Sequence, residues 1–73
     1  MRERVFRIIR EYVSEAVEIQ KDTNLITDLG LTSFDLATMA ADFEDEFGIS
    51  IDTTEMMEIK TVGDIEACIQ SHL

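Results

Sequence analysis

The stretch Asp28-Leu29-Gly30-Leu31-Thr32-Ser33-Phe34-Asp35-Leu36 leads from a polar loop into an amphipathic helix. From its last residue onward, apolar side chains recur every three or four positions, at Leu36, Met39, Ala40, Phe43 and Phe47. This spacing predicts a helix with one buried stripe, which Gly48 ends as a C-terminal cap. Ser33 lies before the stripe, in the turn where backbone N–H groups have no helical partner.

The residues around Ser33 carry the signals of a helix start. Thr32 and Asp35 have the spacing of a capping box, in which each side chain accepts a hydrogen bond from the other residue's backbone N–H. Gly30 provides a positive φ that turns the chain into the helix. An anion attached to Ser33 would meet the free N–H groups and the positive end of the helix dipole, whereas the charges of Asp28 and Asp35 oppose it.

This motif resembles the signature of the acyl carrier protein family, in which a serine receives 4′-phosphopantetheine. The resemblance makes Ser33 the attachment residue, and the flanking motif comprises Asp28, Gly30, Thr32, Phe34 and Asp35. It extends over most of the chain, through the acidic residues before Gly48 to the Thr61-Val62 start of a last helix. A short serine motif alone is modest evidence, but its place in a short, acidic chain with four expected helices strengthens the assignment.

The resemblance implies a carrier rather than an enzyme. A phosphopantetheinyl transferase would transfer the arm from coenzyme A to Ser33. The thiol of the arm would then hold acyl intermediates as thioesters for other enzymes of fatty acid or polyketide biosynthesis, within lipid metabolism. An aminoacyl, D-alanyl or peptidyl carrier is the nearer alternative. The alternative from a different class is an unmodified acidic helical adaptor that binds a basic partner.

The resemblance also makes the second helix the docking surface for basic patches on the modifying and acyl-processing enzymes. The predicted surface mixes acidic with small side chains: Asp35, Ala37, Thr38, Ala41, Asp42, Glu44, Asp45 and Glu46. Phe34 and Thr38 depart from the family pattern, which often has Leu and an acid at these two positions. A dedicated carrier for a specialised pathway is therefore a hypothesis.

Length and composition restrict the other possibilities. With 73 residues and 45% apolar residues, the chain is long enough for one helical domain, residues 1–73, and too short for a deep catalytic cleft. Its formal net charge is −10: residues 1–21 hold five basic and four acidic side chains, whereas residues 22–73 hold one and twelve. This charge repels nucleic acid and steers the chain toward basic partners.

The sequence also predicts a cytoplasmic monomer. Cys68 is the only cysteine, so no disulfide framework is possible within the chain and a reducing compartment is expected. No segment has the length and hydropathy of a membrane span, so we expect no stable membrane insertion. The basic, amphipathic residues 2–10 are interpreted as part of the first helix rather than as a targeting segment.

The apolar periodicity predicts an all-α fold, a small four-helix bundle with three longer helices and one short third helix. The first helix is expected over about residues 3–15, with a buried stripe that continues to Tyr12, Val13 and Ala16. A long first loop, Lys21 to Thr32, follows. At least two of its four apolar side chains should fold back over the core.

The second half of the chain is expected to hold two further helices. Residues 49–51 read as an extended link after Gly48. Capping boxes start the short third helix at Asp52 and the last helix at Thr61. The buried face of the last helix should consist of Val62, Ile65, Cys68 and Ile69.

Other candidate chemistry finds little support in the sequence. A catalytic Ser33 would need a general base, and the only histidine, His72, is expected to be exposed near the end of the last helix. Cys68 is expected to be an inert core thiol. One cysteine and one histidine are too few for a metal site, so we expect none.

Three methionines leave a question open. Met39, Met56 and Met57 either line a flexible cavity for an acyl chain or simply pack in the core. Sequestration of the chain is what the resemblance to fatty-acid carriers implies, whereas composition alone favours neither interpretation.

Overall fold

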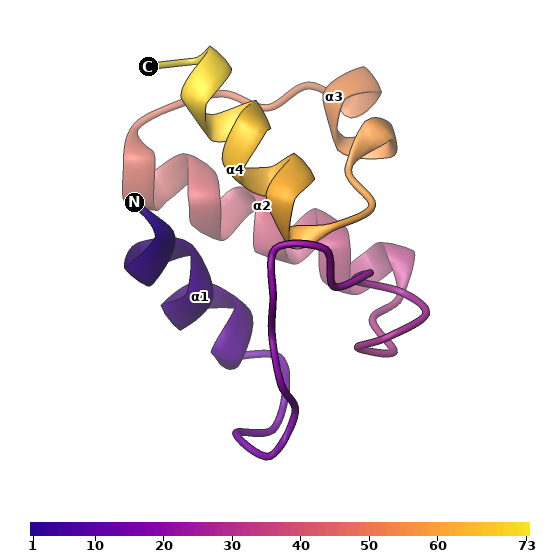
Figure 1. The fold of residues 1–73 in the computed structure, drawn as a ribbon. Helices are drawn as coiled ribbons and strands as arrows, with labels where there is room; N and C mark the ends of the chain where they lie inside the picture. The colour runs from indigo at the N-terminus through magenta and orange to yellow at the C-terminus, as the bar shows by residue number, and fades with distance from the viewer.

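Four helices make up the structure of residues 1–73 in the computed structural model (Figure 1): α1 (Arg2–Arg10), α2 (Ser33–Phe47), α3 (Thr53–Glu58) and α4 (Val62–Ser71). α2 is the longest; α1 packs against both α2 and α4, and α3 packs against α2. The predicted all-α bundle with a short third helix and a long first loop is confirmed. None of the four helices combines the length and the apolar composition that a membrane crossing requires.

The core lies where the apolar faces of α1, α2 and α4 meet. The three helices contribute eight of its eleven buried apolar side chains, and the first loop, which in the structure spans residues 11–32, contributes the other three. They are Val5, Ile8, Ile9, Ile19, Leu25, Leu31, Met39, Phe43, Val62, Ile65 and Ile69. The loop is therefore part of the hydrophobic core as well as a connection.

α1 ends at Arg10, five residues before the predicted end at Glu15. The prediction was wrong because contacts outside the helix hold the next residues in a different conformation. The guanidinium of Arg10 donates to the carbonyl oxygens of Ser14 and Val17, at 2.7 and 2.5 Å. The Ser14 hydroxyl accepts the N–H of Ala16 at 3.1 Å, a local bond that competes with a helical one. Ala16 is consequently exposed instead of lying on a buried stripe.

The loop between α1 and α2 runs against the start of α4 (Figure 1). Backbone N–H groups join the two segments in both directions, at 2.8–3.1 Å: Leu25 to Lys60, Val62 to Thr23, and Gly63 to Lys21. Leu25 and Leu31 are buried, while Ile26 remains 50% exposed. The prediction that at least two apolar loop residues fold over the core is confirmed.

The predicted end of α2 and the predicted start of α3 agree with the structure. Gly48 ends α2 with a φ of 66°, and its N–H donates to the carbonyl of Glu44. Ile49 and Ile51 of the following link are half-buried against the core. A capping box at Asp52 starts α3, which has no fully buried side chain.

α4 departs from its predicted face at one position. Its capping box forms as expected, and Val62, Ile65 and Ile69 are buried. Cys68 is only half-buried. It lies at the edge of the apolar stripe and lines the groove between α3 and α4, so the prediction that it lies in the core was wrong.

Candidate functional site

Ser33 is the first residue of α2, and its side chain is exposed. Its hydroxyl makes no hydrogen bond within the chain. Neither its backbone N–H nor that of Phe34 has an acceptor there, because the bonds of this turn begin with Asp35. The hydroxyl is therefore open to chemical modification. An anion attached to it meets two free N–H groups at the positive end of the helix dipole.

The turn that carries Ser33 is fixed by the predicted capping box. The hydroxyl of Thr32 accepts the N–H of Asp35 at 3.1 Å, and the Asp35 carboxylate accepts the N–H of Thr32 at 2.9 Å. These two bonds satisfy backbone donors on both sides of Ser33 without using its side chain. The attachment residue predicted from the sequence thus has a defined backbone and an unoccupied hydroxyl.

The loop before Ser33 is ordered by Gly30 and Asp28. Gly30 has a φ of 72°, as predicted, and its N–H donates to the carbonyl of Ile26 at 2.9 Å. The Asp28 carboxylate accepts the N–H of Asn24 at 2.8 Å and closes the loop on itself. Gly30 and Asp28 therefore fix the backbone of the loop that leads to α2. The carboxylate of Asp28 bonds to Asn24 and not to Ser33.

The predicted partner surface divides into two groups in the structure. Ala37, Thr38, Ala41 and Asp45 are exposed on the outward face of α2, and Phe34 beside them is 79% exposed. The other predicted members are half-buried and bonded within the chain: Asp35, Asp42, Glu44 and Glu46. The outward face is therefore mainly apolar, with one acid.

Two of these acids bind neighbouring segments. The Tyr12 hydroxyl donates to Asp42 at 2.5 Å, and the backbone N–H of Ile51 donates to Glu44 at 2.7 Å. Burial, followed by the hydrogen bond to Asp42, raises the pKa of Tyr12 to about 12. These side chains attach α2 to the segment after α1 and to the link before α3.

Glu46 joins α2 to α1. Its carboxylate accepts from Arg4 at 2.7 Å and from Arg7 at 3.0 Å, and the Arg4 guanidinium lies 4.3 Å from the ring centroid of Phe47. The hydrogen bond from Arg4, with the charge of Arg7 in addition, lowers the pKa of Glu46. Sequence reasoning did not identify this ion-pair cluster. The signal was the spacing of the two arginines, three residues apart on one face of α1.

Comparison with known proteins identifies the family. Residues 3–69 match the family model described as "Phosphopantetheine attachment site". The chain belongs to the acyl carrier protein family. The acyl carrier protein of Thermotoga maritima is 36% identical over 77 residues, which cover 99% of this chain and 95% of that protein. The acyl carrier protein of Lactobacillus acidophilus is 39% identical over 75 residues, with 96% and 94% covered.

The likeness extends to the fold of known carriers. A solved structure from Mycobacterium tuberculosis, provisionally assigned as an acyl carrier protein, has a TM-score of 0.88 at 30% sequence identity. The alignment covers 96% of this chain and 95% of that one. The four-helix arrangement and the long first loop therefore belong to the shared fold.

Membership in the family makes this acyl carrier protein a carrier and not a catalyst, with 4′-phosphopantetheine as its prosthetic group. That group supplies a thiol on which acyl groups are held as thioesters. The residues at the start of α2 fit it, since Ser33 offers an exposed hydroxyl for an ester and two free N–H groups favour a phosphate's charge. Thr32 and Asp35 hold this turn, and Phe34 lies exposed beside it.

Proposed function

We propose that Ser33 carries the 4′-phosphopantetheine arm, in one acyl-carrier domain over residues 1–73. The supporting observation is its exposed, unbonded hydroxyl on a capped helix turn. Two other serines are used differently: the Ser14 hydroxyl accepts an N–H in the first loop, and the Ser71 hydroxyl donates to the carbonyl of Cys68. A phosphopantetheinyl transferase forms the ester from coenzyme A.

Intact-mass measurement tests the attachment residue. The apo chain, incubated with coenzyme A and a phosphopantetheinyl transferase, should gain the mass of one phosphopantetheine unit. The Ser33→Ala variant should gain none. Ser50→Ala is the matched control, because Ser50 is also exposed but lies in the link before α3, and it should gain the full unit. A gain by Ser33→Ala would contradict the assignment.

The cargo is a fatty acyl or polyketide intermediate. Support comes from a small cavity between α2, α3 and α4, whose nine lining residues are all apolar and include Met39, Met56 and Ile59. Its volume of about 20 Å³ is roughly that of one water, so an acyl chain enters only if α3 moves outward. Met57 takes no part, because it is 74% exposed.

Methionine methyl signals distinguish this cargo from an aminoacyl, D-alanyl or peptidyl one. The holo protein is loaded with a medium-length fatty acyl chain or with D-alanine. The fatty chain should shift the methyl signals of Met39 and Met56, while Met57 serves as an internal control on the surface. Equal spectra for the two loaded forms would favour the alternative class of carrier.

Partner enzymes dock on the second helix, and this monomeric carrier meets them in the cytoplasm. Because Asp42, Glu44 and Glu46 are bonded within the chain, the contact depends on the exposed Phe34 more than on these acids. The Phe34→Ala variant should raise the KM of the transferase for the carrier more than Glu46→Gln does. The reverse order would support docking through a basic patch on the partner alone.

The family match favours this carrier role over an unmodified adaptor.

A further inference from the structure

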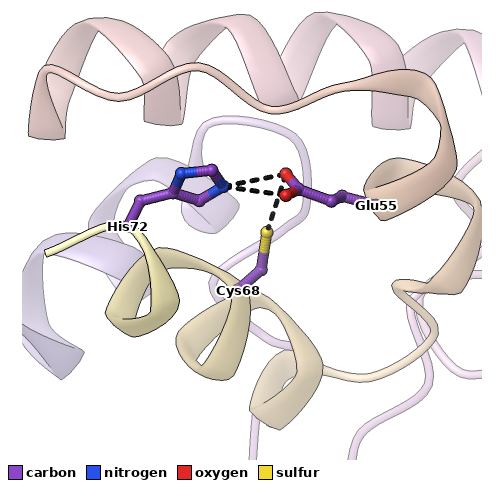
Figure 2. Close-up of side chains that lie close together, drawn as sticks. All are labelled: Glu55, Cys68 and His72. Carbon is purple, nitrogen blue, oxygen red and sulfur yellow. Dashed lines mark hydrogen bonds and ion pairs between the residues drawn. The ribbon is translucent and has the colours of Figure 1, made fainter.

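The groove between α3 and α4 brings together three metal-ligating side chains (Figure 2). Glu55 extends from α3, whereas Cys68 and His72 lie four positions apart on α4 and its C-terminal cap. The Glu55 carboxylate oxygens lie 2.8 and 3.0 Å from Nε2 of His72, and one of them lies 3.9 Å from Sγ of Cys68. The three ligand atoms all lie within 4.8 Å of one another.

We propose that Glu55, Cys68 and His72 bind one Zn²⁺ ion, with water as the fourth ligand. A sulfur, an imidazole nitrogen and a carboxylate oxygen form a donor set that selects zinc over magnesium or calcium, which prefer oxygen ligands only. Three protein ligands and one open position make up a complete tetrahedral zinc sphere.

The geometry requires only small movements. Zinc–ligand bonds of about 2.0–2.3 Å place neighbouring ligand atoms of a tetrahedral site about 3.3–3.6 Å apart. The nitrogen–oxygen separations here are slightly shorter than this, and the sulfur–oxygen separation of 3.9 Å is slightly longer. The sulfur of Cys68 and the nitrogen of His72 lie within 4.8 Å of each other, so this pair has the most distance to close. The side chains of His72 and Glu55 are 27% and 33% exposed and Cys68 is half-buried, so side-chain rotation is the movement that would bring the three ligand atoms to one ion.

The charge around the cluster favours a cation. The carboxylates of Glu55, Glu58 and Asp64 line the groove beside Cys68, and no basic side chain lines it. When zinc binds, the Cys68 thiol releases its proton to solvent and His72 coordinates through an unprotonated Nε2. One thiolate and one carboxylate then neutralise the two charges of the ion.

The bound ion connects α3 to α4. α3 has six residues and no fully buried side chain, so few contacts other than those with α2 hold it. It also supplies Met56 to the apolar cavity beside Ser33's helix. Zinc therefore fixes one wall of that cavity. The sequence alone predicted no metal site, because it contains only one cysteine and one histidine. The fold brings Glu55 next to these two residues, which adds a third ligand.

Cobalt absorption tests the site, because Co²⁺ replaces Zn²⁺ and reports a thiolate ligand directly. The full-length chain is used without an affinity tag and in its apo form, so that Cys68 is the only thiol present. Titration with CoCl₂ should give a thiolate charge-transfer band and the intense visible bands of a tetrahedral ion, saturating at one ion per chain. Added ZnCl₂ should abolish these bands, and added MgCl₂ should not.

Three variants test the ligands, and a fourth is the control. Cys68→Ser should abolish the charge-transfer band. Glu55→Gln and His72→Gln should each weaken binding by more than the roughly 10–100-fold that changes in an outer shell cost. Glu58→Gln removes the same charge from the same helix and groove without touching the cluster, so it should keep the affinity of the unmodified sequence.

Thermal unfolding gives a second, independent readout. ZnCl₂ should raise the Tm of the apo chain and of Glu58→Gln, and should leave the Tm of Glu55→Gln unchanged. The absence of a thiolate band in the unmodified sequence would overturn the proposal, whatever the variants do. Equal weakening by Glu55→Gln and Glu58→Gln would also overturn it, because it would indicate diffuse attraction of cations to an acidic surface.

Discussion

At the scale of single residues, the Tyr12 hydroxyl shows how the surface of α2 is used within the chain. It is half-buried and donates to Asp42. The neutral phenol fits this environment, whereas a phenolate would lose its hydration and face a carboxylate. This is the physical reason for a pKa of about 12, against an ordinary value of 10.0.

Alkaline titration can follow Tyr12 alone, because it is the only tyrosine in the chain. We expect the absorbance of the folded protein to report a pKa of about 12. The neutral phenol stabilises the fold fully below pH 10, and this stabilisation is lost as the pH rises toward 12. Asp42→Asn should lower the pKa only partly, since burial remains. An ordinary pKa of Tyr12 in the folded chain would contradict both its burial and its hydrogen bond to Asp42.

Glu46 provides the matching test at acidic pH. Its pKa is lowered by Arg4 and Arg7, so the ionised pair stabilises the fold above the ordinary carboxyl pKa and loses this effect as the pH falls through the lowered value. Glu46→Gln should therefore lower the Tm at pH 7 and not at strongly acidic pH. Asp45→Asn, which removes an exposed charge without an ion pair, should not lower the Tm at pH 7. Equal effects of both variants would assign the change to net charge.

At the scale of elements, capping boxes start three of the four helices. α2, α3 and α4 each begin with a side chain that accepts the N–H of the third helical residue, and an acid there accepts in return. α1 has no such cap. In α4 the backbone N–H groups of Lys60 and Thr61, with the Thr61 hydroxyl, lower the pKa of Asp64, so this carboxylate is held ionised.

Removal of one cap measures its contribution. Thr61→Ala deletes the hydroxyl that accepts the N–H of Asp64 at the start of α4 and should reduce the free energy of unfolding by about 1 kcal/mol in urea denaturation. Thr54→Ala is the control, because Thr54 is exposed in α3 and its side chain makes no hydrogen bond. If Thr61→Ala reduced the free energy of unfolding by less than Thr54→Ala does, the contacts of the neighbouring loop alone would fix the start of α4.

The caps also explain which elements the sequence predicted well. Capping boxes predicted the starts of three helices, and glycines predicted the turn at Gly30 and the end of α2 at Gly48. The position of Ser33 and the conformation of its turn could therefore be predicted from the sequence. The end of α1 could not be predicted, because it depends on the bonds from Arg10 to the carbonyls of Ser14 and Val17 and on the bond from Tyr12 to Asp42, which apolar periodicity does not express. The internal bonding of Glu46 and the approach of Glu55 to His72 depend on helix packing, which no local spacing expresses.

At the scale of the whole molecule, charge is distributed unevenly. Residues 22–73 carry a formal charge of −11 and residues 1–21 a charge of +1, and only a few of the acids beyond residue 21 form ion pairs. Mutual repulsion among the others destabilises the compact state. We expect NaCl to raise the Tm at pH 7, because screening reduces this repulsion more than it weakens the three arginine–glutamate pairs.

Calorimetry at several salt concentrations tests this expectation. The increase should disappear near the isoelectric point of about 4.2, where most of the repulsion is gone. A Tm independent of salt at pH 7 would mean that the ion pairs on α1 already offset the repulsion.

The backbone bonds between the first loop and the start of α4 have a consequence for how the molecule opens. Residues 21–25 and 60–63 are joined by hydrogen bonds, so we expect the first loop and the start of α4 to separate together. The amides of Leu25, Val62 and Gly63 should then exchange with deuterated solvent at one common slow rate, that of complete unfolding. The loop that leads to Ser33 is thus fastened to α4 at residues 21–25. Under the proposed function, the travel of a bound acyl group then comes from the arm and not from this part of the loop.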